Sequence, residues 1–175
     1  MQIFRKDRIL KTLAYLLLTV LTAALETSVL SNWRILGATP ELLPFVAAAA
    51  AVYEGPMAAV WSGFFVGLLM DGLGAKSLWW YTVSMTGMSA LIAAISPHLF
   101  RPRWTTAVLW GALMQLISEF FRFFVVFYLF SRADLSAVVT VLLPQLLISA
   151  LLSPLIIAPL AALHRVCQRD TSLFR

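Results

Sequence analysis

Three polar residues within an apolar stretch, residues 104–130, are the strongest candidates for chemistry in this chain. Gln115, Glu119 and Arg122 follow one another at i, i+4 and i+7, so a helix carries them on one face. Glu119 and Arg122 are close enough in sequence to pair, which keeps either charge from facing lipid alone. Three uses fit this stripe: an internal ion pair that fixes packing, a contact for another transmembrane helix, or a ligand or proton site.

Asp71 is a second ionisable residue at apolar depth, and it follows a GxxxG pattern formed by Gly63 and Gly67. Glycines at this spacing let another helix approach closely. We expect Asp71 to cap the following segment or to accept hydrogen bonds from free backbone N–H groups at a helix break. This group of residues is therefore expected to pack the helical hairpin of residues 42–73 and to position a partner.

The first and last apolar stretches carry further polar groups. Glu26 lies near the end of the first stretch, and we expect it to be solvated at an interface. The last stretch has a polar stripe at i, i+4 and i+8, formed by Gln145, Ser149 and Ser153. Helix–helix hydrogen bonding is the expected use of this stripe, with the lining of a cavity as the alternative.

Sequence patterns of known catalytic sites do not occur in this chain. There is no HExxH, no GxSxG and no phosphate-binding P-loop. An intramembrane aspartyl protease needs two aspartates at membrane depth, and Asp71 is the single candidate. We therefore expect no catalytic residues, no metal ion, no cofactor and no enzymatic activity.

The composition identifies the lipid bilayer as the solvent of this chain. Of its 175 residues 61% are hydrophobic and 12% are charged, so a soluble domain would leave too much apolar surface in water. We expect an all-α membrane protein in which residues 1–175 form a single domain, a six-helix polytopic bundle with a short second helix. The expected spans are residues 10–30, 42–53, 56–73, 78–95, 104–130 and 135–163.

The second span is too short to cross a bilayer by itself. Residues 42–53 make a helix of about 18 Å, whereas the hydrocarbon layer is about 30 Å thick. We interpret residues 42–73 as a helical hairpin with a short first limb and a hinge at Glu54-Gly55-Pro56. The alternative is a re-entrant segment, which would change the number of crossings.

The distribution of basic residues predicts the orientation. A six-span chain has nine of them on one side: Arg5, Lys6, Arg8, Lys11, Arg101, Arg103, Arg165, Arg169 and Arg175. The other side has Arg34, Lys76 and Arg132. The positive-inside rule then places both termini in the cytoplasm. The net charge of +5 is thus an orientation signal, and we expect no nucleic-acid partner. The first span is expected to be a retained anchor and not a cleaved signal peptide.

The stretch from Thr39 to Ser89 resembles the MreD family of bacterial rod-shape-determining membrane proteins. The resemblance rests on Pro40-Glu41-Leu42-Leu43-Pro44, Glu54-Gly55-Pro56, and Gly63-Phe64-Phe65-Val66-Gly67-Leu68-Leu69-Met70-Asp71. That family shows a proline-acidic start, a short limb and a GFxxGLxxD segment. About 50 of the 175 residues carry the match. The chain departs from the family pattern at Gly74-Ala75-Lys76-Ser77-Leu78-Trp79-Trp80, where a small-residue turn and a Leu-Gly pair are usual.

The resemblance implies a non-catalytic scaffold of the cell-elongation machinery in the bacterial inner membrane. Similar proteins bind MreC, a single-pass scaffold protein, and through it connect to peptidoglycan transpeptidases and glycosyltransferases and to MreB filaments. The resemblance also implies a fold similar to the substrate-binding subunits of energy-coupling-factor transporters, with an outward-facing cavity.

A rival interpretation has the same size and number of spans: a vitamin-binding subunit that works with cytoplasmic ATPases. Such a carrier needs several polar and aromatic groups around one pocket. Asp71, Trp79, Trp80 and Tyr81 are the conceivable members.

Overall fold

The computed structural model describes residues 3–32, 39–74, 79–99, 102–130 and 142–172, and these residues form helices without any strand. The α-helices of this part are α1 (Ile3–Ser28), α2 (Leu43–Tyr53), α3 (Pro56–Gly74), α4 (Trp80–Leu99), α5 (Trp104–Phe130) and α7 (Leu143–Ser172). A 3₁₀ turn, η1 (Leu30–Asn32), follows α1. The expected all-α class is confirmed.

Four of these helices are long and apolar enough to cross a membrane: the spans are Thr12–Asn32, Pro56–Leu73, Trp104–Phe124 and Leu143–His164. The chain is therefore a membrane protein. Helix α2 is apolar but has only 11 residues. Helix α4 has the length of a span, but serines and threonines make it less apolar.

The largest boundary difference concerns the last helix. The sequence predicts it over residues 135–163, whereas α7 begins at Leu143 and ends at Ser172. Pro144 suits this start because the first turn of a helix needs no N–H donor. Residues 135–141 lie outside the described part of the chain. Helices α1 and α4 also differ from the predicted spans, because α1 begins at Ile3 and α4 ends at Leu99.

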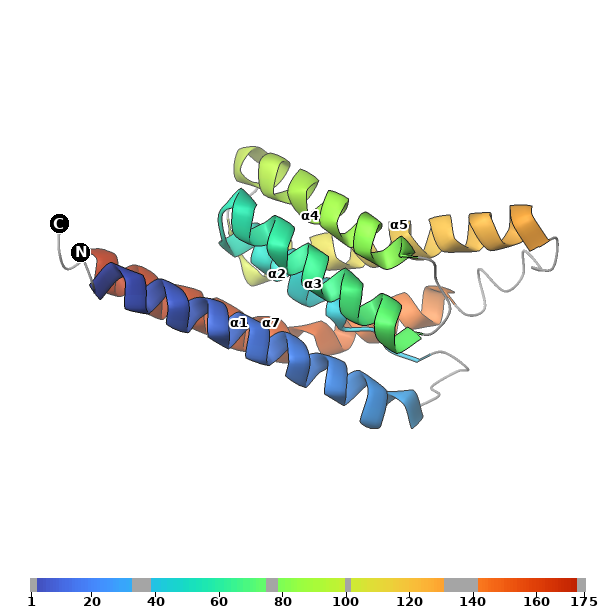
Figure 1. The fold of residues 1–175 in the computed structure, drawn as a ribbon, viewed down its shortest axis with the longest axis horizontal. Helices are drawn as coiled ribbons and strands as arrows, with labels where there is room; N and C mark the ends of the chain where they lie inside the picture. The colour runs from blue at the N-terminus through green and yellow to red at the C-terminus, as the bar shows by residue number, and fades with distance from the viewer. Residues whose placement is uncertain (1–2, 33–38, 75–78, 100–101, 131–141, 173–175) are drawn as a thin grey trace.

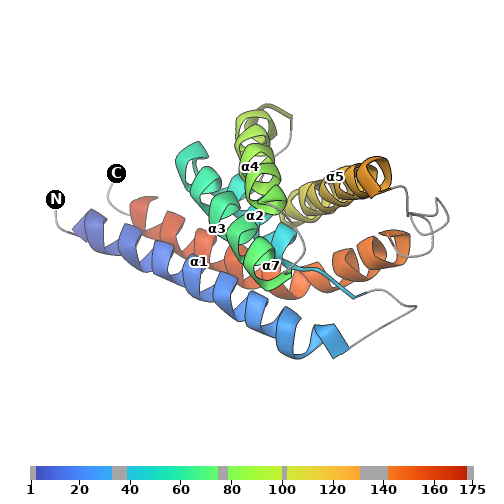
Figure 2. The ribbon, with the colours of Figure 1, turned by 45° about the vertical axis from the view of Figure 1, so that its right-hand side comes forward.

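Successive helices run in opposite directions (Figure 1). Consequently several helix ends lie together at one end of the bundle, as the second view also shows (Figure 2). They are the start of α1, the end of α7, the turn between α2 and α3, and the end of α4. Helices α1 and α7 lie side by side at this end. We call it the terminal end, and it is the end at which the basic residues of the two outer helices are located.

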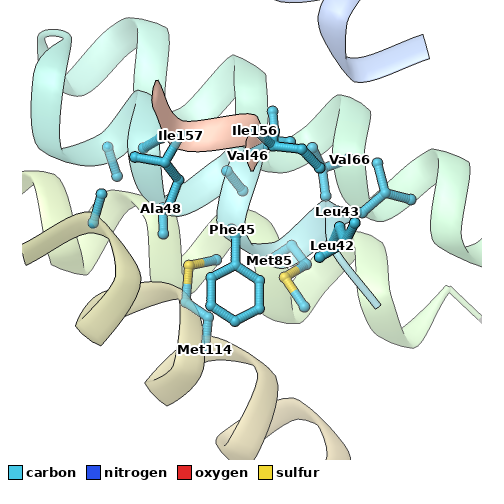
Figure 3. Close-up of a cluster of buried hydrophobic side chains, with 14 of the residues drawn as sticks. Leu42, Leu43, Phe45, Val46, Ala48, Val66, Met85, Met114, Ile156 and Ile157 are labelled. Carbon is cyan, nitrogen blue, oxygen red and sulfur yellow. The ribbon is translucent and has the colours of Figure 1, made fainter. Parts of the chain in front are cut away.

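Helix α2 is the central element of the bundle. It contacts each of the other five α-helices, and its residues from Leu43 to Ala51 are buried on every side. Five consecutive alanines, residues 47–51, allow this close packing because they project little beyond the backbone. Phe45 fills the space between α4 and α5, where Met85 and Met114 cover its ring (Figure 3). A helix that is apolar all round is stable only when it is buried in this way.

Helices α3 and α4 form the most extensive contact between two elements. A Cβ atom added to Gly67 would lie 2.5 Å from the Cα atom of Thr82, and one added to Gly63 would lie 2.6 Å from the carbonyl oxygen of Met85. No real Cβ atom approaches backbone so closely, so the two glycines set the distance between the helices. The close approach predicted from the GxxxG pattern is confirmed, and the neighbour is α4 of the same chain.

Candidate functional site

The start of α2 lies inside the bundle and has no cap of its own. The N-cap residue, Leu42, has no side-chain oxygen, and the carboxylate of Glu26 on α1 takes its place. Glu26 accepts hydrogen bonds from the backbone N–H groups of Leu42 and Leu43, the latter at 2.6 Å. Glu26 is therefore partly buried and caps α2, in addition to any contact with the interface that was expected of it. A helix start inside a membrane bundle must find its acceptors in the protein, and this carboxylate supplies them.

Glu41, the residue before this N-cap, meets α5 and α7. Its backbone N–H donates to the Ser149 hydroxyl at 2.9 Å, and the same hydroxyl oxygen accepts a hydrogen bond from the Gln115 amide at 3.3 Å. The Glu41 carboxylate is hydrogen-bonded to the side chain of Gln145. Because Gln145 and Ser149 lie one turn apart on α7, one face of that helix binds both the backbone and the side chain of Glu41.

Glu119 and Arg122 form the ion pair that their spacing predicts. The Arg122 Nε donates to Glu119 Oε2 at 3.0 Å, and a guanidinium Nη2 contacts the same oxygen. The Tyr81 hydroxyl of α4 donates to the other oxygen of Glu119. The side chain of Glu119 is 5% exposed and that of Arg122 is 41% exposed, so the pair has a buried acidic end and an outer basic end.

These groups make one interior polar cluster, which brings together all six helices except α3. Its members are Glu26, Glu41, Tyr81, Gln115, Glu119, Arg122, Gln145 and Ser149. Among the described residues, no three histidine, cysteine, aspartate or glutamate side chains gather as a metal-binding group. The cluster therefore offers electrostatic binding and hydrogen bonding.

Asp71 caps α4 from the neighbouring helix α3. Its carboxylate accepts hydrogen bonds from the Tyr81 N–H at 3.1 Å, the Thr82 N–H at 2.8 Å and the Thr82 hydroxyl at 2.6 Å. The capping role predicted for Asp71 is confirmed. With Gly63 and Gly67, Asp71 joins α3 to α4, so these three residues pack α3 against a helix outside the hairpin of residues 42–73, which corrects the expectation.

Replacement of Asp71 by alanine should lower the free energy of unfolding by about 1–3 kcal/mol, because two backbone donors and one hydroxyl lose a charged acceptor. Asp71→Asn keeps one carbonyl oxygen as an acceptor and should lose less stability. Thermal unfolding in detergent measures both variants. Equal midpoints for wild type and Asp71→Ala would show that the cap does not stabilise the fold.

A lateral groove of about 760 Å³ lies between α1 and α3 near the terminal end. One face of α1 forms a wall with Thr12, Tyr15, Leu16 and Thr19, and the first three turns of α3 form the other. At its end the Tyr15 hydroxyl donates to Glu54 Oε1 at 3.1 Å, and His164 Nδ1 lies 3.3 Å from the same oxygen. The groove is thus apolar along its length and polar at the hinge between α2 and α3.

Sequence reasoning identified one half of the interior polar cluster and missed the other. Gln115, Glu119 and Arg122 were found because they share a helix face, and Gln145 and Ser149 for the same reason. Glu41 was identified as part of a family-like motif, but no contact was predicted for it. The contacts from Glu26 to the start of α2 and from Tyr81 to Glu119 carry no local sequence signal.

The residues considered as the pocket of a carrier divide between the interior of the bundle and its surface. Asp71 and Tyr81 make hydrogen bonds inside the bundle, whereas Trp79 is 65% exposed. The lateral groove is lined by other residues.

Comparison of this chain with known proteins identifies no relative. No protein-family model matches this chain, and no curated protein or solved structure gives a significant match.

Proposed function

We propose that this chain is a non-catalytic membrane scaffold of a bacterial cell-elongation complex. In this proposal it crosses the inner membrane six times with both termini in the cytoplasm. It binds an MreC-type single-pass protein and through it helps to position peptidoglycan synthases, and indirectly MreB filaments, to set rod shape. Its fold is expected to be similar to that of the substrate-binding subunits of energy-coupling-factor transporters.

The observation that carries this proposal is the structural use of the family-like segment from Pro40 to Asp71. Its first part leads into α2, the central helix, and its last part supplies the glycines and the aspartate that attach α4. The residues that resemble the MreD family are therefore those around which the whole bundle is organised. This supports a resemblance in fold and not only in a short string of residues.

The lateral groove supports a partner that is itself a transmembrane helix. Its α3 wall has small residues one turn apart, Ala58 and Ser62, beside the larger Trp61 and Phe65. Small residues allow a second helix to approach, and aromatic neighbours give it area to cover. Trp61 and Phe65 of this wall are exposed, so a single-pass protein within the membrane can reach them.

A large side chain placed in the groove should block binding of the partner without unfolding the chain. Ala58 is exposed, so Ala58→Trp should keep the wild-type melting midpoint while it lowers the recovery of an MreC-type protein by about tenfold. The matched control is Ala94→Trp, a substitution at an exposed alanine of α4. Co-purification from native membranes, with mass spectrometry of the bound proteins, measures the recovery. Equal recovery with both variants would exclude the groove as the contact.

The carrier is the second candidate, and the volume of the groove favours it, since pockets for small molecules have about 300–1,000 Å³. The same purification separates the two functions. Co-purification of cytoplasmic ATPases, or of a vitamin-sized molecule in an amount equal to that of the chain, would contradict the scaffold proposal and support a transporter subunit. A single-pass protein and a cell-wall transpeptidase in near-equal amounts would support the scaffold.

A further inference from the structure

The interior polar cluster contains buried acceptors that the protein leaves without a donor. Gln115 is 2% exposed, and its carbonyl oxygen has no hydrogen-bond partner, although its amide nitrogen is bound to Ser149. One carboxylate oxygen of Glu41 is also buried and without a partner. The Glu41 backbone N–H and the Gln115 amide both donate to the Ser149 hydroxyl, so the two residues are neighbours in the cluster. A buried polar atom without a partner is costly and calls for an explanation.

The cluster has an excess of negative charge around these free acceptors. Glu41 lies close enough to Glu26, Glu119 and Arg122 to interact electrostatically with each of them. Three carboxylates thus face one guanidinium group. Arg122 is already bound to Glu119, so it offsets only part of the remaining negative charge.

The depth of the cluster makes this imbalance expensive. The 11 residues of α2 span about 16 Å. With the hinge placed at the membrane surface, the start of α2 lies about half-way through a hydrocarbon layer of about 30 Å. The positive end of the α2 dipole offsets part of the charge on Glu26, which caps it. Glu41 caps no helix, and the side chain of Gln145 is the hydrogen-bond partner of its carboxylate. In secondary transporters, ion and substrate sites also lie near the middle of the bilayer, where helices are interrupted.

We propose that the interior polar cluster binds a small monovalent cation, held by the free oxygens of Glu41 and Gln115. The chemistry follows from the free groups, because both are acceptors and the surrounding charge is negative. A metal ion such as Na⁺ would be coordinated by these oxygens, and an ammonium ion would donate hydrogen bonds to them. The scaffold function does not require this site, so the two proposals fail independently.

The test is the melting midpoint of the purified full chain in an uncharged detergent at constant ionic strength. With choline as the reference cation, Na⁺ or ammonium should raise the midpoint by about 3 °C or more at pH 9. Choline is too large for the site and has no N–H group, so it controls for ionic strength. A shift with Na⁺ alone indicates coordination, and one with ammonium alone indicates hydrogen bonding. The shift should be smaller at pH 6, where a proton competes for Glu41.

Two variants and one control assign the shift to this cluster. Glu41→Gln removes the charge, and Gln115→Met removes the amide carbonyl while keeping the shape; each should abolish the cation dependence. Glu54→Gln changes a carboxylate at the other end of α2 and should retain it. Equal midpoints in all salts would overturn the proposal. So would a midpoint that depends on pH alone, which would place a proton on Glu41 in place of the cation.

Discussion

Gly67→Ala should destabilise the protein by about 1–3 kcal/mol, the usual cost of overpacking a close contact. The added methyl group would lie 2.5 Å from the Tyr81 carbonyl oxygen and from the Thr82 Cα atom. These are backbone atoms of α4, which cannot rotate away as a side chain can. Helix α4 must therefore move, and the hydrogen bonds from Tyr81 and Thr82 to Asp71 weaken with it. Reversible unfolding in detergent measures the loss.

Gly72→Ala is the matched control, because it makes the same chemical change on the same helix. No atom lies within 4 Å of a Cβ added to Gly72, and alanine favours the helical conformation. Its stability should equal or slightly exceed that of the wild type. If Gly67→Ala and Gly72→Ala melted alike, the contact between α3 and α4 would not be as close as the structure describes.

Arg122→Leu should also cost up to about 3 kcal/mol, because it leaves the Glu119 carboxylate buried with Tyr81 as its remaining donor. The value lies at the low end for a buried ion pair because Arg122 is 41% exposed. Glu119→Gln should cost less. Its amide oxygen still accepts from Tyr81, and the long Arg122 side chain can extend towards the membrane surface.

The double variant Glu119→Gln/Arg122→Leu distinguishes a buried pair from two solvated residues. It should be more stable than Arg122→Leu alone, because the second substitution removes the uncompensated charge. A double-mutant cycle on unfolding free energies gives the coupling. Additive losses, or equal stability of all four proteins, would show that both side chains contact water.

Much of the local structure could be predicted because lipid imposes simple rules. The apolar stretches predicted α5 at its observed bounds, Trp104–Phe130, and α2 and α3 to within one residue. Helical periodicity also predicted the Glu119–Arg122 pair, since three residues along a helix are always neighbours. The predicted start of the last span, residues 135–141, lies outside the described part of the chain, and its end was predicted too early because α7 continues to Ser172.

The long-range contacts of the site could not be predicted in this way. Glu26 meets Leu43 across 17 positions, Tyr81 meets Glu119 across 38, and Glu41 meets Ser149 across 108. No local pattern relates such residues, because the partners are chosen by which helices pack around α2. Glu26 was assigned to the interface for this reason: its position in the first apolar stretch is visible in the sequence, but the uncapped helix start beside it is not.

The sequence by itself determined the solvent, the helical class, the approximate helices and the residues that share a helix face, because each depends on neighbours within a few turns. Only the tertiary structure decided that α2 is central, that Asp71 and Glu26 cap helices other than their own, and that the carboxylates converge on one interior cluster. The physical reason is that every buried backbone and charged group must find a partner inside the bundle, and the identity of that partner depends on how all the helices pack together.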